Sequence, residues 1–135
     1  MYQHMTHREM RDVQQYILSQ KHMVVPCVHF GEPRSCHANA KLYCETNKGW
    51  NVVSGWVLHD GETAMLHSVV FNVGTGEFLD VTLSSQFSEI KLVPDARLKM
   101  VEQWGALELA LGDKLMPPSV SLNVDYTAPP KTLRL

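Results

Sequence analysis

The sequence predicts an α+β fold in which N-terminal helices pack on a small antiparallel sheet. Two segments of the first 47 residues have helical periodicity, and three segments rich in Val, Phe and Trp follow between residues 51 and 83. Because helices and strands are segregated along the chain, the pattern favours α+β over a parallel α/β arrangement. We expect one domain at residues 1–115 and a Pro-containing extended tail at residues 116–135.

The first expected helix covers residues 7–21. Val13 and Ile17 lie one turn apart on what would be its apolar face. Thr6 precedes the segment and Glu9 follows three residues later, which is the spacing of a capping box. The sequence therefore indicates where this helix begins.

The second expected helix covers residues 36–47 and follows a short apolar extended segment at residues 23–30. Ser35 is a suitable N-cap residue, and Gly49 lies just beyond the expected end. This arrangement places Cys36 in the first helical turn.

The rest of the domain is expected to form strands and a third helix. Tight connections containing Gly61 and Gly74 separate three strand-like segments, so we expect an antiparallel meander. Asp95 and Gly112 are suitable cap and stop residues for the third helix. The expected strands are residues 51–59, 65–73, 77–83 and, more briefly, 89–93, and the expected helix is residues 95–111.

Composition and charge exclude several classes of function. Fourteen acidic and 12 basic residues give a net charge of −2, so the chain lacks the basic excess of a nucleic-acid-binding protein. No apolar run approaches the ~20 residues that a membrane helix needs. The N-terminus does not resemble a signal peptide, so we expect a cytoplasmic protein. Three cysteines without a signal peptide favour free thiols over disulfides.

Three residues form a candidate catalytic group. Cys36 lies at a helix start, where the helix dipole favours a thiolate, while His67 and Asp80 lie on successive expected strands. A turn centred on residue 75 would pair His67 with a residue near 83, about three positions from Asp80. Contact between the two side chains therefore requires a bulge or an off-centre turn.

These residue types suit nucleophilic catalysis. Cys36 would attack a carbonyl carbon, His67 would transfer the proton, and Asp80 would orient the imidazole. The backbone amide of Cys36 would give one oxyanion donor. An aspartate within an apolar strand is unfavourable unless it is paired, which makes Asp80 informative.

The same residues resemble the transglutaminase-like, papain-like superfamily of cysteine hydrolases. The resemblance covers residues 35–82, about a third of the chain, and rests on Ser35-Cys36-His37-Ala38-Asn39-Ala40, Gly55-Trp56, Leu66-His67-Ser68-Val69 and Phe78-Leu79-Asp80-Val81-Thr82. It implies a helix that begins with the nucleophile, followed by strands that carry His and Asp.

The resemblance also implies a reaction class. It implies acyl transfer on a peptide, a protein or a small amide or thioester, by hydrolysis or transfer, with no cofactor. In many members an aromatic or Gln side chain completes the oxyanion hole, but no Gln closely precedes Cys36. Asn39 and Trp56 are tentative substitutes, and Trp50 is a further candidate.

Two other functions remain open. The chain could be a catalytically inactive binding module on the same fold, or a metal-binding protein whose ligands are Cys27, His29, Cys36, His37 and Cys44. Their spacing matches no common zinc module, and we expect no metal site. We expect Cys27 and Cys44 in the core, and His37 pointing about 100° away from Cys36 on the helix.

Overall fold

The computed structural model describes residues 2–32, 35–58, 60–82 and 88–126. This part of the chain is a mixed α/β structure with two helices and mostly strands, so its strand content exceeds the expectation. None of its helices is long and apolar enough to cross a membrane. The elements are β1 (Gln3–His4), α1 (His7–Ser19), β2 (Met23–Gly31), α2 (Cys36–Thr46), β3 (Trp50–Leu58), β4 (Thr63–Asn72), β5 (Phe78–Thr82), β6 (Glu89–Pro94), β7 (Leu98–Gln103), β8 (Ala106–Leu111), β9 (Lys114–Leu115) and β10 (Ser119–Ser121).

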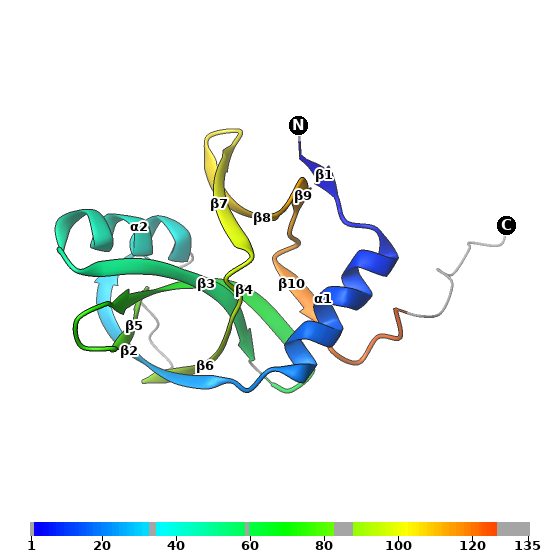
Figure 1. Ribbon diagram of the computed structural model, residues 1–135, viewed down its shortest axis with the longest axis horizontal. Coiled ribbons are helices and arrows are strands. Elements are labelled where there is room, and N and C mark those ends of the chain that lie inside the picture. Colours follow the sequence, from blue (N-terminus) through cyan, green and yellow to red (C-terminus); the bar gives the residue numbers. More distant parts are fainter. Residues whose placement is uncertain (1, 33–34, 59, 83–87, 127–135) are drawn as a thin grey trace, which may run out of the picture.

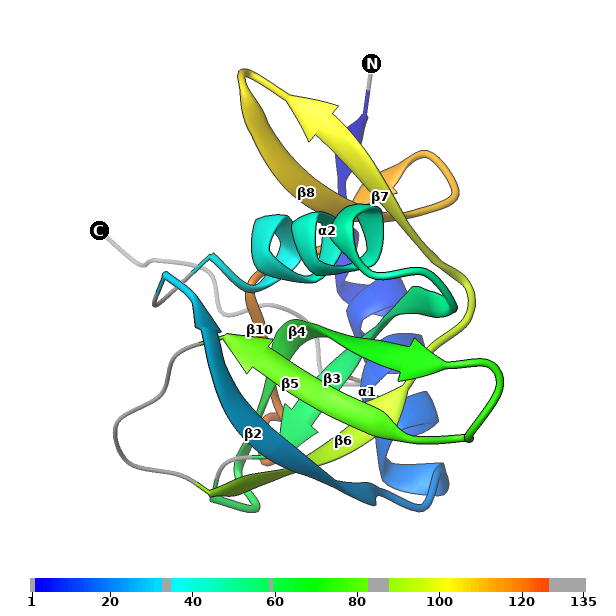
Figure 2. The ribbon, with the colours of Figure 1, turned by 90° about the vertical axis from the view of Figure 1, so that its left-hand side faces the viewer.

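Five strands form a closed ring. The main sheet has the order β10-β4-β3-β6-β2-β5, and an additional pairing between β4 and β5 closes the five strands β4-β3-β6-β2-β5 into a ring, with β10 outside it. Figures 1 and 2 show these strands curling around a common interior, with α2 lying across the outside. Val25, Val69 and Leu92 are fully buried together in one core cluster of these strands. The ring is thus a small barrel.

The expected meander is confirmed. β3 pairs antiparallel with β4 along its whole length, and β4 pairs with β5 through Val70–Leu79 and Phe71–Phe78. The extended segment before Cys36 is β2, and the short strand expected at residues 89–93 is β6. Gly55 allows β6 to approach β3 closely, because a Cβ atom there would overlap the carbonyl oxygen of Val93.

Helix α2 covers the outer face of β3, β4 and β5. Its Ala40 is fully buried against Val70 and Val81. At the far end of the helix, the ring of Tyr43 packs edge-on against that of Trp50, with centroids 5.5 Å apart. These contacts fix the helix, and with it the position of Cys36 at its start.

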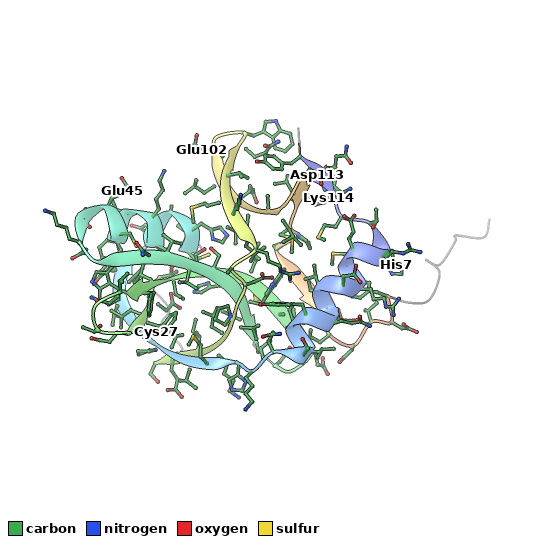
Figure 3. The ribbon with its side chains drawn as sticks, in the orientation of Figure 1. His7, Cys27, Glu45, Glu102, Asp113 and Lys114 are labelled. Carbon is green, nitrogen blue, oxygen red and sulfur yellow. The ribbon has the colours of Figure 1, made fainter. Side chains whose placement is uncertain are left out.

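Helix α1 begins as expected and closes a second core. Glu9 N–H donates to Thr6 Oγ1 at 3.2 Å, and Thr6 N–H donates to Glu9 Oε1 at 2.8 Å, which completes the capping box. Val13 and Ile17 are buried against Trp56 of β3. A salt bridge of 3.5 Å between Glu9 and Lys114 links α1 to the smaller sheet β1-β9-β8-β7. Figure 3 labels Lys114.

The helix expected at residues 95–111 is wrong. This segment contains the antiparallel hairpin β7–β8, in which Gln103 pairs with Ala106 around the turn residues Trp104 and Gly105. Both turn residues have positive φ, at 49° and 78°, as in the two-residue turns that match strand twist. The spacing of the apolar residues in this segment is compatible with both a helix and a strand, and the turn at Trp104 and Gly105 makes the segment a hairpin.

The expected tail contributes to the fold. β10 pairs antiparallel with β4, and Val120 is fully buried, while Met116 is 5% exposed. Met116 and Val120 belong to the core cluster around α1. Residues 127–135 lie outside the described residues.

Candidate functional site

Cys36 is the first residue of α2, and it is partly buried. The N-cap residue is Ser35, but its side chain makes no capping hydrogen bond within the described chain, so this helix start differs from that of α1. The first amides of a helix have no intrahelical acceptor, and their dipole favours an anion. The local backbone therefore favours a negatively charged sulfur at Cys36.

Asn39 anchors this helix start to two strands. Its Nδ2 donates to the carbonyl oxygen of Glu32 at 2.7 Å and to Thr82 Oγ1 at 3.2 Å. A Cβ atom at Gly31 would overlap the Asn39 side chain, so the glycine makes room for this contact. Asn39 thus links the ends of β2 and β5 to the turn that carries Cys36.

His67 and Asp80 lie in contact on β4 and β5. His67 Nε2 is 3.0 Å from Asp80 Oδ2, and the two side chains are 17% and 3% exposed. The N–H direction does not fit a well-aligned hydrogen bond, so the contact is an ion pair. Continuing the observed register puts Asp80 opposite Val69, and alternate residues of a strand share a face. The two side chains are therefore diagonal neighbours, and no bulge is needed.

The carboxylate of Asp80 is held by two further groups. Its Oδ1 accepts a hydrogen bond from Thr82 N–H at 3.1 Å, and the Cys27 thiol donates to Oδ2 at 3.6 Å. Cys27 is the register partner of Asp80 in the parallel pair β2–β5. These contacts orient Oδ2 towards His67.

The pKa values of Cys36 and His67 shift in opposite directions. Burial raises the pKa of the Cys36 thiol, but hydrogen bonds from His37 and His67 and the charges of these imidazoles more than offset it, and the pKa falls from 9.0 to about 6. Burial lowers the pKa of His67, but its interactions with Asp80 and Cys36 raise it from 6.5 to about 9. Between these values the favoured state is a thiolate beside an imidazolium.

His37 contacts the thiol as well, although we expected it to point away. Its Nδ1 lies 3.7 Å from Cys36 Sγ and 2.6 Å from Ser68 Oγ. The angle of 100° between successive helical residues did not predict this contact, because the imidazole is long enough to turn back towards Cys36. An adjacent Cys-His pair was the only signal in the sequence.

The two tentative oxyanion residues, Asn39 and Trp56, have different surroundings. Both side-chain amide donations of Asn39 go to Glu32 and Thr82, as described above. Trp56 is fully buried in the core beside α1, and its Nε1 has no partner among the described residues. Trp50 packs on Tyr43 at the other end of α2. The amide of Cys36 remains the candidate donor at the thiol itself.

The other two cysteines differ from Cys36. Burial, followed by the charge of Asp80, raises the pKa of Cys27 to about 12, and burial raises that of Cys44. Among the described residues no group of three or more His, Cys, Asp or Glu side chains is arranged to hold a metal ion. The side chain of His29, one of the ligands considered, lies outside the described part.

A cavity of about 570 Å³ lies between α2, β3 and the β7–β8 hairpin. Its walls are mainly apolar, and Lys41 and Glu102 add charges of opposite sign; Glu102 is labelled on the hairpin in Figure 3. Ser54 lines the cavity, and its Oγ lies 2.8 Å from Ser68 Oγ. Because Ser68 contacts His37, a continuous polar chain leads from the cavity to Cys36.

Comparisons with protein-family models, curated proteins and solved structures find no match to this chain. The resemblance to cysteine hydrolases therefore stays an expectation from the sequence.

Proposed function

We propose that the protein is a cysteine-dependent acyl-transfer enzyme in which Cys36 is the nucleophile, His67 the acid and base, and Asp80 the residue that orients His67. The observation that carries this proposal is the contact of His67 with the Asp80 carboxylate at 3.0 Å, and His67 is also one of the groups that lower the pKa of the Cys36 thiol. Strongly perturbed titratable groups of this kind cluster at catalytic sites. The proposed substrates are peptides, proteins and small amides or thioesters.

In the first step, Cys36 Sγ attacks the carbonyl carbon of the substrate. The bond to the amine or thiol leaving group then breaks, and His67 gives its proton to that group. The negative charge that develops on the carbonyl oxygen accepts a hydrogen bond from the Cys36 amide at the helix start. The product is a thioester on Cys36 and a neutral His67.

In the second step, water or an amine attacks the thioester, and His67 accepts the proton. Acylation removes the negative charge of Cys36, which is one of the causes that raise the pKa of His67. The pKa of His67 therefore falls in the acyl-enzyme, and the imidazole becomes a base. The carbon–sulfur bond breaks, the acid or new amide leaves, and the thiolate returns.

We assign the apolar part of the substrate to the cavity beside α2. Its apolar lining and few polar groups are typical of small-molecule and side-chain binding sites. The contacts that lead from Ser54 to Cys36 are 2.8, 2.6 and 3.7 Å long and pass through buried Ser68, so the cavity lies close to the thiol. A peptide with an apolar side chain near the reacting carbonyl fits this arrangement.

Acylation by p-nitrophenyl acetate tests the proposal. We expect a burst of p-nitrophenol equal to the enzyme concentration, and intact-mass and peptide analysis should locate one acetyl group on Cys36. The Cys36→Ala variant should show no burst. The Cys44→Ala variant is the matched control, because Cys44 lies on the same helix and has a raised pKa.

A folded protein that gives no burst and carries acetyl equally on all three cysteines would overturn the proposal. That result would favour the alternative of a catalytically inactive binding module. A circular dichroism spectrum that is unchanged by Cys36→Ala shows that the comparison is made between folded proteins.

A further inference from the structure

Two imidazoles interact with the thiol of Cys36, and they have different surroundings. His67 is paired with the carboxylate of Asp80 at 3.0 Å. His37 instead contacts the hydroxyl of Ser68 at 2.6 Å, and its Nδ1 lies 3.7 Å from the sulfur. The mechanism proposed above uses only the first of these imidazoles.

The strand β4 supports both imidazoles. His67 and Ser68 are adjacent in this strand, so their side chains leave opposite faces of the sheet. His67 reaches Cys36 on the face shared with Asp80, whereas Ser68 holds His37 under α2. The two imidazoles therefore have partners on opposite faces of β4, and both interact with Cys36 in the same structure.

A chain of hydroxyl groups fixes the ring of His37. Ser68 is fully buried, and its Oγ lies between His37 Nδ1 and Ser54 Oγ, at 2.6 and 2.8 Å. A thiolate only accepts hydrogen bonds, so with Cys36 ionised the hydrogen must lie on Nδ1. Ser68 Oγ and the sulfur then share this one Nδ1 hydrogen in a three-centre hydrogen bond, with Ser68 as the nearer acceptor, and the hydrogen of Ser68 points to Ser54. The hydroxyl groups of Ser68 and Ser54 thus fix the ring of His37 with its hydrogen on Nδ1.

We infer that His37 is a second catalytic residue, whose Nδ1 hydrogen is shared between the Cys36 thiolate and Ser68 Oγ, and that Ser68 and Ser54 are positioning residues for its ring. This inference rests on the proposed acyl-transfer function. His37 stabilises the charge on the sulfur in the free enzyme and again when the carbon–sulfur bond of the thioester breaks. His67 at that moment holds the proton taken from water or the amine, so the two imidazoles have separate tasks.

The test is the pH dependence of Cys36 alkylation by iodoacetamide, followed by mass spectrometry on the whole protein. In His37→Ala we expect the midpoint to rise by about one pH unit, which lowers the thiolate population up to about tenfold below the midpoint. His37→Asn keeps an N–H donor near the position of Nδ1 and should recover part of the shift. His22→Ala is the matched control, because His22 is exposed between α1 and β2.

The serine variants separate positioning from folding. Ser68→Ala and Ser54→Ala should raise the midpoint in the same direction as His37→Ala, with the smaller effect at Ser54, which is farther from the sulfur. Deacylation of the acetyl-enzyme should be slower in His37→Ala than in the unaltered protein. If His37→Ala does not fold, His37→Asn and Ser68→Ala answer the same question.

An unchanged midpoint of Cys36 alkylation in folded His37→Ala would overturn the inference. If His37→Ala does not fold, an unchanged midpoint in both Ser68→Ala and His37→Asn would overturn it. The proposed function fails separately, by the absence of an acetyl group on Cys36, because alkylation by iodoacetamide requires no turnover. A shifted midpoint with unchanged deacylation would also contradict the role assigned to His37 at thioester cleavage.

Discussion

The imidazole of His67 lies 3.0 Å from the carboxylate of Asp80, although their strands pair directly at only two positions. The diagonal offset across β4 and β5 is sufficient for long side chains to meet. The Asp80 carboxylate also accepts hydrogen bonds from Thr82 N–H and the Cys27 thiol, which fix its position independently of His67. The ion pair is thus supported by three strands of the barrel.

Replacement of this carboxylate should make Cys36 less reactive. Asp80→Asn removes the main interaction that raises the pKa of His67, so this pKa falls. The imidazole then loses its positive charge, which stabilises the thiolate of Cys36. We expect the rate of alkylation at pH 7 to fall about tenfold. Asp95→Asn is the matched control: Asp95 is buried and paired with Arg97 at 2.8 Å, so its loss should lower stability while the midpoint stays unchanged.

The free energy of unfolding should depend on pH through the same pair. The raised pKa of His67 stabilises the fold below pH 6.5, and this contribution is lost as the pH rises through about 9. The lowered pKa of Cys36 stabilises the fold above pH 9, and this contribution is lost as the pH falls through about 6. Between pH 6.5 and 9 the folded pair and the unfolded pair each hold one proton, so the two slopes cancel.

Cys36→Ala removes this cancellation. The contribution of Cys36 disappears, and that of His67 becomes smaller because the thiolate is one of the causes that raise its pKa. The interaction with Asp80 still raises the pKa of His67, so the variant should lose stability relative to the unaltered protein as the pH rises above 6.5. Thermal melting curves of both proteins at several pH values measure the difference. Parallel curves across this range would contradict the assigned ion pair.

At Gly105, in the turn between β7 and β8, a substitution by alanine should change the free energy of unfolding in a direction that depends on the fold. Gly105 has φ at 78°, a left-handed conformation that costs an L-residue about 1–2 kcal/mol, and no neighbouring atom lies within 4 Å of a Cβ added there. Gly105→Ala should therefore lower the free energy of unfolding by about 1 kcal/mol. In the helix expected from the sequence, the same change would raise it by about 1 kcal/mol. Urea unfolding decides between the two signs.

The segment after residue 115 should be essential for stability. Val120 is fully buried beside α1, so Val120→Ala should lower the free energy of unfolding by about 2 kcal/mol. Val124 is 48% exposed, and Val124→Ala should change the free energy little. Equal effects of the two substitutions in urea unfolding would contradict the packing of β10 described above.

Local signals in the sequence were sufficient for several elements. Thr6 and Glu9 predicted the start of α1, and the Gly-containing turns predicted the antiparallel strands that carry His67 and Asp80. These features depend on residues a few positions apart, whose preferences act before the rest of the chain folds. The expected placement of Cys36 at a helix start is likewise confirmed.

Features that depend on distant segments could not be predicted in this way. The pairing of β10 with β4 joins residues more than 50 positions apart, so nothing near Val120 indicated that it would be buried. The β7–β8 hairpin depends on positive φ at Trp104, which is unusual for a non-glycine residue. The contact between His37 and Cys36 depends on Ser68, which comes from another strand.

The alkylation rate of Cys36 as a function of pH tests most directly whether His67 and its partners activate this thiol. We expect the rate to rise with a midpoint near pH 6, and Cys27 and Cys44 to stay unmodified at pH 7 because their pKa values are raised. In His67→Ala the midpoint should move up towards 9. A midpoint near 9 in the unaltered protein, with all three cysteines labelled alike, would contradict the proposed nucleophile.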